Sequence, residues 1–542
     1  MAREGYKTQV LESFAGGLNY RTDQFNLQPN ESPDLLNVDI DPRGGVKLRN
    51  GVTAVNATQV SAHQIRGIGS FFTDTGTSQI IVNTGDSSNN IKYSTGSNFT
   101  TLSGPTARTA SSRMYGMTMN NKFYGVSGDI ASFKWDGSSG ADLGVNLNGS
   151  DGNFPIAQYT AFWNNFAWAA KTREDGTYEN SRLRWSNANF PEKWTSTDYV
   201  DIDEGEVGDY ITGLLPLSDR LLVFKNNSVH AVYGFDSDSF EVVALSRDVG
   251  SIALSSPVST PYGVFFWHGR NGVYLYNGET FVNVFEKLRP AIDNGRISFT
   301  TAPQLAWYEN RLYVSVDMLK FYTTSSDRER HTFIFDPSIQ SWTLTDIKVA
   351  SMHVHTPPTG DVLLLGASEF SGSSDKGRLV KMEQDLTTDS YNGSASTHIT
   401  SHFTTPWISG TNPVVKKRWG RPQVVLDAAS TSTMAIDVYS DYDKASTNKT
   451  VYLNVVGRDS SSTWGADSSG STTWASSADS EGAPLGGNGV WASEAAASIT
   501  DIIRLQSLGL SKSVALKING PTQSVNWEVN GLMFTYKPRR LR

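Results

Sequence analysis

One strand-turn unit recurs seven times along this chain and constrains its fold more than any other feature. Each copy begins with an apolar strand after a polar turn, and the strands are anchored on Ile80, Phe123, Phe166, Leu221, Val264, Leu312 and Val362. Successive anchors are 43, 43, 55, 43, 48 and 50 residues apart, and the step of 55 indicates an insertion near residues 174–206. Propeller blades of four strands take about 40 to 50 residues each, so the spacing predicts a mainly β protein with a β-propeller of six or seven blades.

A second strand follows the first in most copies and ends in turn residues, as in Lys134–Gly137 and Tyr274–Gly278. Asp-Gly and Asn-Gly are strong hairpin signals, because these residues tolerate the positive φ of tight turns. A linear array of β-sandwiches is the alternative architecture. We favour the propeller, because a ring of sheets protects strand edges that a linear array of this length would leave open.

The end of the repeats divides the chain into three parts. We expect an N-terminal segment over residues 1–60, the β-propeller over 61–408 and a C-terminal β platform domain over 409–542. Ser32 and Pro33 have the positions of an N-cap and a first helical residue, so we expect a short helix over Ser32–Asn37, followed by a hairpin. Another short helix is expected over Asn283–Ile292, interrupted at Pro290.

The platform domain contains an unusual stretch at residues 458–493. It is rich in Ser, Ala and Gly but carries Trp464, Trp474 and Trp491. Such a composition is typical of a flexible loop, whereas large aromatic side chains are favoured at buried contacts. Two interpretations are therefore open, an arm that orders against a neighbouring subunit and an untethered loop.

Charge and composition exclude several classes of protein. The 542 residues include 46 basic and 54 acidic side chains, for a net charge of −8, which argues against a conventional DNA-binding protein. Cysteine is absent, which excludes disulfides, cysteine nucleophiles and thiolate zinc sites. No apolar run approaches the roughly 20 residues of a membrane span, and the first residues lack a hydrophobic signal segment. We therefore expect a protein made in the cytosol.

The motifs of common enzymes are missing. The sequence has no Gly-x-Ser-x-Gly elbow, no phosphate loop and no dinucleotide fingerprint after a strand, so we expect no enzyme and no cofactor. Residues Phe335–Trp342 loosely resemble the Asp-turn-Trp hairpins of glycosidase propellers and of kelch blades, but they lack the Ser and Gly of the glycosidase repeat. We interpret this stretch as a hairpin with a packing Trp.

Histidine and acidic pairs are weak metal candidates. His353 and His355 would share one face of a strand, whereas His398 and His402 would stand too far apart on a strand to chelate. The densest acidic patch, residues 198–209, lacks the Gly and final Glu of a calcium loop. We favour turn formation and solvation for the acidic pairs Asp39 and Asp41, Asp201 and Asp203, Asp236 and Asp238, and Asp441 and Asp443.

Basic residues cluster at two places in the platform domain. The candidates for docking a partner are Lys416, Lys417, Arg418, Arg539, Arg540 and Arg542. Short basic clusters are usually solvated, but they can dock on an acidic protein or on a phosphate backbone. On an acidic chain we favour a protein partner.

The sequence motif that is most specific to one family lies near the N-terminus. It comprises Phe14–Asn19, Gln28–Pro33, Leu36–Asp39 and Gly44–Gly51, that is, a Gly turn, a capped segment and a Gly-turned hairpin. This order resembles the start of the tail nozzle proteins of short-tailed bacteriophages, the tail tubular protein B family. The candidates for an assembly signature are Phe14, Gly16, Gly17, Asn19, Pro33, Asn37, Gly44, Arg49 and Gly51.

The resemblance implies a structural virion protein of the phage tail, assembled in the bacterial cytoplasm. It implies a homohexameric ring below the portal and adaptor proteins, an attachment point for fibres or spikes, and a lumen through which viral DNA is ejected without specific binding. It implies no catalytic residues, metal or cofactor. The alternatives are a propeller that binds or degrades carbohydrate on the host surface, and a scaffold for protein contacts unrelated to phage.

Overall fold

The computed structural model describes residues 5–539 except for 57, 89, 96–97, 144–151, 153, 207, 253–256, 299–300, 320–326, 358–359, 371–374, 394–395, 411, 429–431, 445–446, 448, 456–498 and 506. The chain divides into two compact units. The propeller unit comprises Asn50–Pro337 and Leu344–Thr397, and the platform unit comprises Met1–Arg49, Ser338–Thr343 and His398–Arg542.

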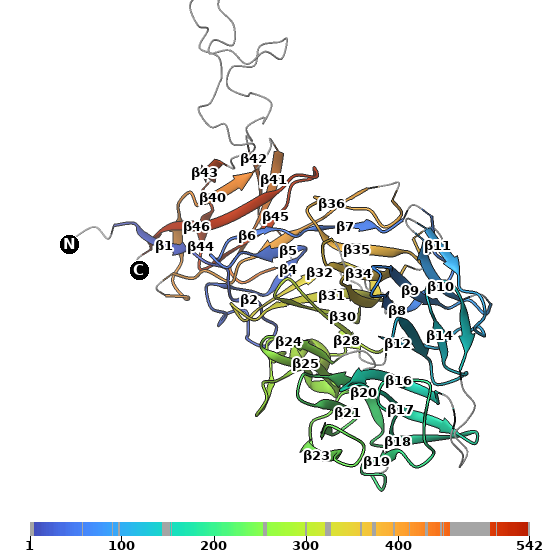
Figure 1. Cartoon of the computed structure of the whole chain (residues 1–542). Helices are drawn as coiled ribbons and strands as arrows, with labels where there is room; N and C mark the ends of the chain where they lie inside the picture. Colours follow the sequence, from blue (N-terminus) through green and yellow to red (C-terminus); the bar gives the residue numbers. More distant parts are fainter. Residues whose placement is uncertain are drawn as a thin grey trace, which may run out of the picture. The chain divides into compact units, whose positions relative to one another are not determined.

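Seven antiparallel sheets make up the propeller, and six of them consist of consecutive strands (Figure 1). The first four sheets are β8 (Ile65–Phe72), β9 (Ser78–Thr84), β10 (Ile91–Thr95) and β11 (Asn98–Thr101); β12 (Tyr115–Met119), β13 (Lys122–Val126), β14 (Phe133–Trp135) and β15 (Gly140–Asp142); β16 (Ile156–Trp163), β17 (Phe166–Glu174), β18 (Thr177–Trp185) and β19 (Tyr199–Asp201); and β20 (Ile211–Pro216), β21 (Leu221–Lys225), β22 (Val229–Tyr233) and β23 (Glu241–Ser246).

The last three sheets complete the ring. They are β24 (Val258–Thr260), β25 (Gly263–His268), β26 (Gly272–Tyr276) and β27 (Phe281–Asn283); β28 (Ile297–Ser298), β29 (Gln304–Tyr308), β30 (Arg311–Leu319), β31 (Arg328–Asp336) and β32 (Ser341–Thr345); and β33 (Val349–His355), β34 (Leu363–Ser368), β35 (Leu379–Gln384) and β7 (Gly51–Ala54). Two short strands follow, β36 (Thr388–Asp389) and β37 (Thr397–His398).

The ring closes at the seventh sheet. Its inner strand β33 contacts β8, the inner strand of the first sheet, and its outer strand is β7 from the start of the chain. The Val52 amide of β7 donates at 3.1 Å to Oδ1 of Asp389, a residue that follows the last strand of this sheet in the chain. The prediction of a β-propeller is therefore confirmed, with seven blades among the described residues. Residues 51–54, which we expected in the N-terminal segment, lie in the propeller.

The seven repeat anchors mark the second strand of each sheet. Six of them lie in that strand, and Val362 directly precedes β34. These strands lie in the middle of their sheets and are covered on both faces by neighbouring sheets, so their residues are almost continuously buried, as in β21. The long step between the third and fourth anchors reflects the nine-residue strands β17 and β18 and the loop that follows them.

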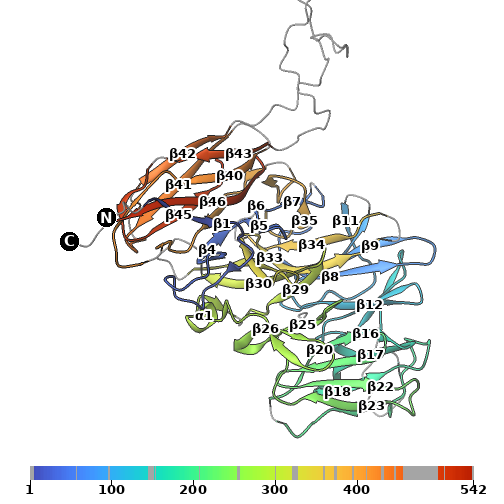
Figure 2. The same ribbon diagram turned by 90° about the vertical axis from the view of Figure 1, so that its left-hand side faces the viewer.

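The platform unit combines both ends of the chain (Figure 2). Its larger sheet contains β1 (Lys7–Leu11), β5 (Val38–Ile40), β6 (Val46–Leu48), β39 (Lys417–Trp419), β40 (Gln423–Ala428), β43 (Ile499–Arg504), β44 (Gly509–Ser511) and β46 (Trp527–Pro538). Its smaller sheet contains β4 (Asp34–Leu36), β38 (His402–Thr404), β41 (Ser432–Ser440), β42 (Lys449–Val455) and β45 (Val514–Asn519), and β2 (Gly17–Leu18) pairs in parallel with β3 (Glu31–Ser32). The two ends that we expected to form separate parts lie in the same sheets.

The helix expected at Ser32–Asn37 is wrong, because these residues form β3 and β4. The Ser32 hydroxyl donates to the carbonyl of Thr404 at 2.7 Å, and β4 pairs with β38. The N-cap signal is local, whereas this pairing joins segments that are distant in the sequence. Tertiary hydrogen bonds therefore override the local preference.

Helical structure is limited to two short pieces among the described residues. The 3₁₀ turn η1 covers Gly269–Asn271, and α1 covers Arg289–Asp293 with Pro290 in its first turn. The prediction of a helix from Asn283 interrupted at Pro290 is therefore wrong, since Pro290 helps to begin the helix instead of breaking it. No helix of the described chain is long and apolar enough to cross a membrane.

Candidate functional site

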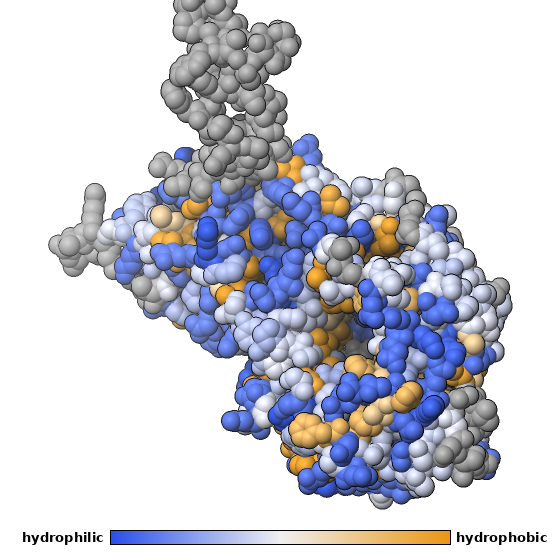
Figure 3. Space-filling model, viewed as in Figure 1, coloured by the Kyte–Doolittle hydropathy of each residue, from blue (hydrophilic) through white to orange (hydrophobic). Residues whose placement is uncertain are grey.

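An axial cavity of about 470 Å³ lies where the seven sheets converge. All seven sheets contribute to its wall through the strands β8, β12, β16, β20, β24, β29 and β33, and Figure 3 shows a hollow in the propeller at this place. Gly67 and Gly116 keep these strands close together, since a Cβ at Gly67 would lie 2.6 Å from the Met114 carbonyl and one at Gly116 would lie 2.1 Å from the Phe123 ring. Arg66 is the one charged residue among the described residues that line the cavity.

His353 lies in the wall of this cavity and hydrogen bonds to a serine. The Ser70 Oγ is 2.7 Å from His353 Nε2 and 2.8 Å from His355 Nδ1, and the Ser78 Oγ is 3.2 Å from His355 Nε2. Burial lowers the pKa of His353 to about 4, and the neighbouring His355 adds to this effect. Burial thus favours the neutral form of both rings, and serine hydroxyl groups hydrogen bond to them. The described residues contain no group of three or more His, Asp or Glu side chains placed to hold a metal ion.

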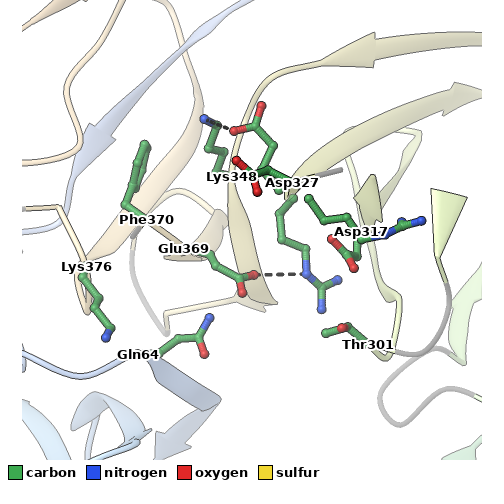
Figure 4. A pocket seen from close by; sticks show the side chains of 11 residues that line it. Gln64, Thr301, Asp317, Asp327, Lys348, Glu369, Phe370 and Lys376 are labelled. Atoms are coloured by element: carbon green, nitrogen blue, oxygen red, sulfur yellow. Dashed lines mark hydrogen bonds and ion pairs between the residues drawn. The ribbon is translucent and has the colours of Figure 1, made fainter. Parts of the chain in front are cut away.

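A second hollow, the charged pocket, has a volume of about 620 Å³ (Figure 4). Arg330 of β31 is 2% exposed, and its Nε donates to Glu369 Oε2 at 3.1 Å. Its two terminal nitrogens donate to the carbonyls of Ser315 and Ala302, both at 3.2 Å. The residues that line the pocket are Gln64, Thr301, Asp317, Asp327, Arg328, Glu329, Arg330, Lys348, Glu369, Phe370 and Lys376.

Other charges of the pocket form a second network. Lys348 Nζ lies 2.7 Å from Glu329 Oε2, and His331 Nε2 lies 3.2 Å from Glu329 Oε1. The His331 hydrogen bond, together with Lys348, lowers the pKa of Glu329 to about 2. Asp317, which also lines the pocket, behaves differently from Glu329, because burial raises its pKa. The pocket therefore combines fixed ion pairs with a carboxyl group that is less readily ionised.

The acidic patch at residues 198–209 contributes to a smaller hollow of about 270 Å³ in the third and fourth sheets. Its carboxylates are paired: Asp201 accepts two hydrogen bonds from Arg182 at 2.8 Å, and Asp203 Oδ2 lies 2.6 Å from Arg247. Asp209 Oδ2 accepts from the Ser228 hydroxyl at 2.7 Å and lies 3.6 Å from Lys225 Nζ. Asp201, Asp203 and Asp209 are thus held in internal ion pairs.

The remaining acidic and histidine pairs have structural contacts. Asp41, Asp236 and Asp441 accept backbone N–H groups of Arg43, Ser239 and Lys512, respectively. His398 and His402 lie in different strands, so the single strand that we expected for them is wrong. His402 Nε2 lies 3.1 Å from Asp34 Oδ2, an interaction that lowers the Asp34 pKa despite burial, which would raise it.

All nine signature residues are buried within this chain. Phe14 packs edge-on against Phe403 at 5.0 Å, and the Pro33 side chain is enclosed in the same unit. Asn37 has a φ of 55°, donates to the Thr400 carbonyl at 2.8 Å and accepts from Arg49 Nε at 2.8 Å. These contacts connect the N-terminal residues with the strands near the C-terminus.

Turn geometry accounts for the other signature positions. Asn19 Oδ1 accepts the amides of Arg21 and Thr22 and so closes a turn. The glycines allow close approach of other chain segments. A Cβ at Gly16, Gly17, Gly44 or Gly51 would lie 2.6, 2.1, 2.4 or 2.2 Å, respectively, from its nearest neighbour.

The basic docking candidates separate into one buried residue and several exposed ones. Lys417 is wrong as a docking residue, because it is fully buried and its Nζ donates to the carbonyls of Asn412, Val415 and Lys512. Burial lowers its pKa. Lys416, Arg418 and Arg539 are exposed near one another, since Arg418 lies opposite Lys537 and the Arg539 amide donates to the Lys416 carbonyl. Arg540, Arg542, Trp464, Trp474 and Trp491 lie outside the described residues.

The sequence could have revealed the burial of Lys417 but not the charged pocket. Lys417 and Trp419 are two residues apart and share one face of β39, so the large aromatic side chain indicated a buried face. The charged pocket brings together residues from Gln64 to Lys376, and no local motif connects them.

Comparisons with known proteins add no functional assignment. No family model and no curated protein matches this chain. Similar solved structures include YCF48 bound to a D1 peptide (9% identity, TM-score 0.39, 65% of this chain and 100% of that one), the Pan2 WD40 domain of Neurospora crassa (8%, 0.36, 62% and 96%) and BamB of Moraxella catarrhalis (12%, 0.35, 67% and 97%). At these values the similarity carries no argument about function, and strand pairing alone defines the propeller here.

Proposed function

We propose that this chain is a structural virion protein, a subunit of the tail nozzle of a short-tailed phage, and that it acts within a ring and not as an enzyme. The proposal is carried by the contacts that the signature residues make inside the platform unit. Asn37 and Phe14 contact Thr400 and Phe403, respectively, so the motif that resembles the nozzle family holds the two ends of the chain together. A signature built into the platform unit is consistent with a resemblance that extends to both chain ends.

The size of the axial cavity bears on the path of the DNA. Its volume of about 470 Å³ is that of a small-molecule pocket, which typically measures about 300–1,000 Å³. A nozzle made of this chain would therefore pass DNA through the opening between subunits and not through each propeller. The net charge of −8 per chain supplies no excess of cations to displace the counterions of DNA, so the duplex would slide without sticking.

Contacts with other tail proteins belong to the same proposal. The exposed Lys416, Arg418 and Arg539 would dock an acidic surface of an adaptor, fibre or spike protein. The segment with Trp464, Trp474 and Trp491 would be the arm that reaches the neighbouring subunit.

The proposal is tested by the mass and symmetry of the purified full chain. Six copies of a 59.3 kDa chain have a mass of about 356 kDa, which mass photometry resolves from a monomer, and negative-stain images should show sixfold rings. A triple variant that replaces the three arm tryptophans by serine should yield folded monomers. Monomers of the unaltered chain at micromolar concentration, together with absence of the chain from purified virions, would contradict the proposal and favour an unrelated scaffold.

A second candidate function is a propeller that binds or degrades host surface glycans. The charged pocket favours it, because its lining includes the buried guanidinium group of Arg330 and the aromatic ring of Phe370. Release of reducing sugar from host polysaccharide by a purified monomer would support this function over the nozzle.

A further inference from the structure

The larger sheet of the platform unit carries a group of cations on its outer side, where β39, β44 and β46 meet. The cations alternate along the strands with buried residues such as Lys417 and Trp419 of β39, so they project from one side of the sheet. Asp441 borders the group, where it accepts the backbone amide of Lys512 at 2.6 Å. None of the cations forms an ion pair with another described residue. The basic face consists of Lys416, Arg418, Lys512, Lys537 and Arg539.

The strand register places like charges of the basic face next to one another. Arg418 lies opposite Lys537 of β46, and the pairing of β39 with β44 places Lys416 beside Lys512. Opposed residues of an antiparallel pair have Cα atoms about 4.5–5.5 Å apart, and like charges at that separation destabilise the sheet. The whole chain has a net charge of −8, so this concentration of cations is local. A negatively charged partner would therefore stabilise the basic face.

Apolar side chains border the same cations. Val414 is 70% exposed, Tyr6 63% and Leu510 43%. Leu510 lies opposite Arg418, and Lys537 Nζ is 6.0 Å from the centre of the Tyr6 ring. A phosphate backbone would use the cations alone, whereas an acidic peptide with aromatic side chains would use both kinds of residue. The basic face therefore suits an acidic, aromatic segment of a protein.

The chain itself contains a segment of this kind. Residues 456–498 carry five carboxylates and a single basic side chain, Arg458. Each tryptophan of the segment is followed by a carboxylate three or five residues later. The pairs are Trp464 and Asp467, Trp474 and Asp479, and Trp491 and Glu494. The charge of the segment is thus opposite to that of the basic face, and its aromatic groups match the exposed apolar residues.

The segment is attached to the sheet far from the basic face. It connects Val455, the end of β42, with Ile499, the start of β43. Ile499 pairs with Ala428, which in turn pairs with Trp527, the first residue of β46. Lys537 lies ten residues farther along β46, which at about 3.3 Å per residue is roughly 33 Å away.

This separation suits a contact between subunits. A chain of 43 residues can span up to about 140 Å, enough to reach another copy. A ring built head to tail needs two different, complementary surfaces on each subunit. The platform unit has them at opposite ends of one sheet, the acidic segment at one end and the basic face at the other.

We propose that the basic face binds residues 456–498 of a neighbouring copy of the chain. Carboxylates of the segment pair with the lysines and arginines, and its tryptophans pack on the exposed apolar residues and on the Arg418 guanidinium group. The inference rests on the proposed ring and specifies the contact that closes it. A subunit then occupies the basic face within the ring, so an adaptor, fibre or spike protein as its partner is an alternative that the tests separate.

Charge reversal of the basic face tests the inference in the full chain. In analytical ultracentrifugation the face variant, Arg418→Glu with Lys537→Glu, should be a monomer of 59.3 kDa, whereas the unaltered chain forms a ring six times as heavy. The matched control, Arg270→Glu with Lys449→Glu, makes the same change in net charge at two exposed positions outside the basic face and should keep the ring. Rings of the face variant would overturn the inference but not the nozzle proposal, and they would leave the basic face to an adaptor, fibre or spike protein. Monomers of the unaltered chain would contradict both.

Mixing two monomeric variants shows whether the contact joins two copies. The face variant keeps its tryptophans, and the variant with the three tryptophans replaced by serine keeps its basic face. At about 100 µM of each, where an interface of several charged and aromatic contacts is populated, the mixture should contain a heterodimer of about 119 kDa that neither variant forms alone. The face variant should unfold at the same temperature as the tryptophan variant, because the reversed cations form no ion pair within the described chain. Absence of the heterodimer would show that the segment does not bind the basic face of another copy and would refute the proposal.

Discussion

Replacing Asn37 by alanine tests whether the N-terminal signature stabilises the platform unit. Asn37 is fully buried, accepts from Arg49 Nε at 2.8 Å and donates to the Thr400 carbonyl at 2.8 Å. A hydrogen bond to a charged group contributes about 1.5–3 kcal/mol, and a neutral one contributes about 0.5–1.5 kcal/mol. Alanine at the observed φ of 55° adds a strain of about 1 kcal/mol. We therefore expect Asn37→Ala to cost about 3–5 kcal/mol.

The control for this prediction is Asn37→Gly. Glycine loses the same two hydrogen bonds but tolerates a positive φ, so it should be about 1 kcal/mol more stable than Asn37→Ala. Because a chain of two units need not unfold in one step, hydrogen exchange is the suitable assay. Exchange should accelerate more than about 100-fold in β4 and β38, while β21 of the propeller unit serves as the internal reference. An Asn37→Ala loss below about 1 kcal/mol, or identical behaviour of the two variants, would refute this reasoning.

Two further substitutions probe buried ionisable groups. His353 has a pKa of about 4 in the folded chain and an ordinary value of 6.5, so the unfolded chain binds more protons between these pH values. Stability should fall as the pH drops from about 6.5 to about 4, and His353→Gln should remove about 1–3 kcal/mol of that dependence in urea titrations; an unchanged pH profile would contradict the assignment. Lys417→Met removes the buried donor of three carbonyls and should cost about 2–4 kcal/mol, whereas Arg418→Met on the exposed face should cost less than about 0.5 kcal/mol. Equal midpoints for these two variants in thermal unfolding would show that Lys417 is not held as described.

The propeller could be predicted from the sequence because its hairpins are local. Six of the seven blades consist of strands that follow one another in the chain, so the anchor spacing and the turn residues contain most of the information about the fold. The helix expected at Ser32–Asn37 failed for the opposite reason. Its capping signal is local, but the partner that decides its conformation, β38, lies far along the chain.

The candidate sites show the same division between local and distant information. Residues such as Gly17 and Gly44 were recognisable as turn positions, and both have positive φ. The charged pocket was not recognisable, because Arg330 lies in the sixth sheet and Glu369 follows β34 of the seventh, and they become neighbours only when these two sheets pack together. A lone Arg or Lys in a sequence gives no sign of whether its partner lies within the chain or in a ligand.

Strand order also determines when the two units can form. β7 pairs with β35, and β1 and β6 pair with β46, so these three N-terminal strands need partners that are synthesised much later. The bond from Asn37 to Thr400 spans 363 residues, and such distant contacts carry a large loop-closure cost before they stabilise anything. The blades made of adjacent strands can form during synthesis, whereas the seventh sheet and the platform unit cannot be completed until the rest of the chain is present. The signature residues are buried in the finished protein and are therefore exposed in the growing chain. Their close-packed glycines and capped turns become ordered late, when the two ends of the chain come together in one cooperative step.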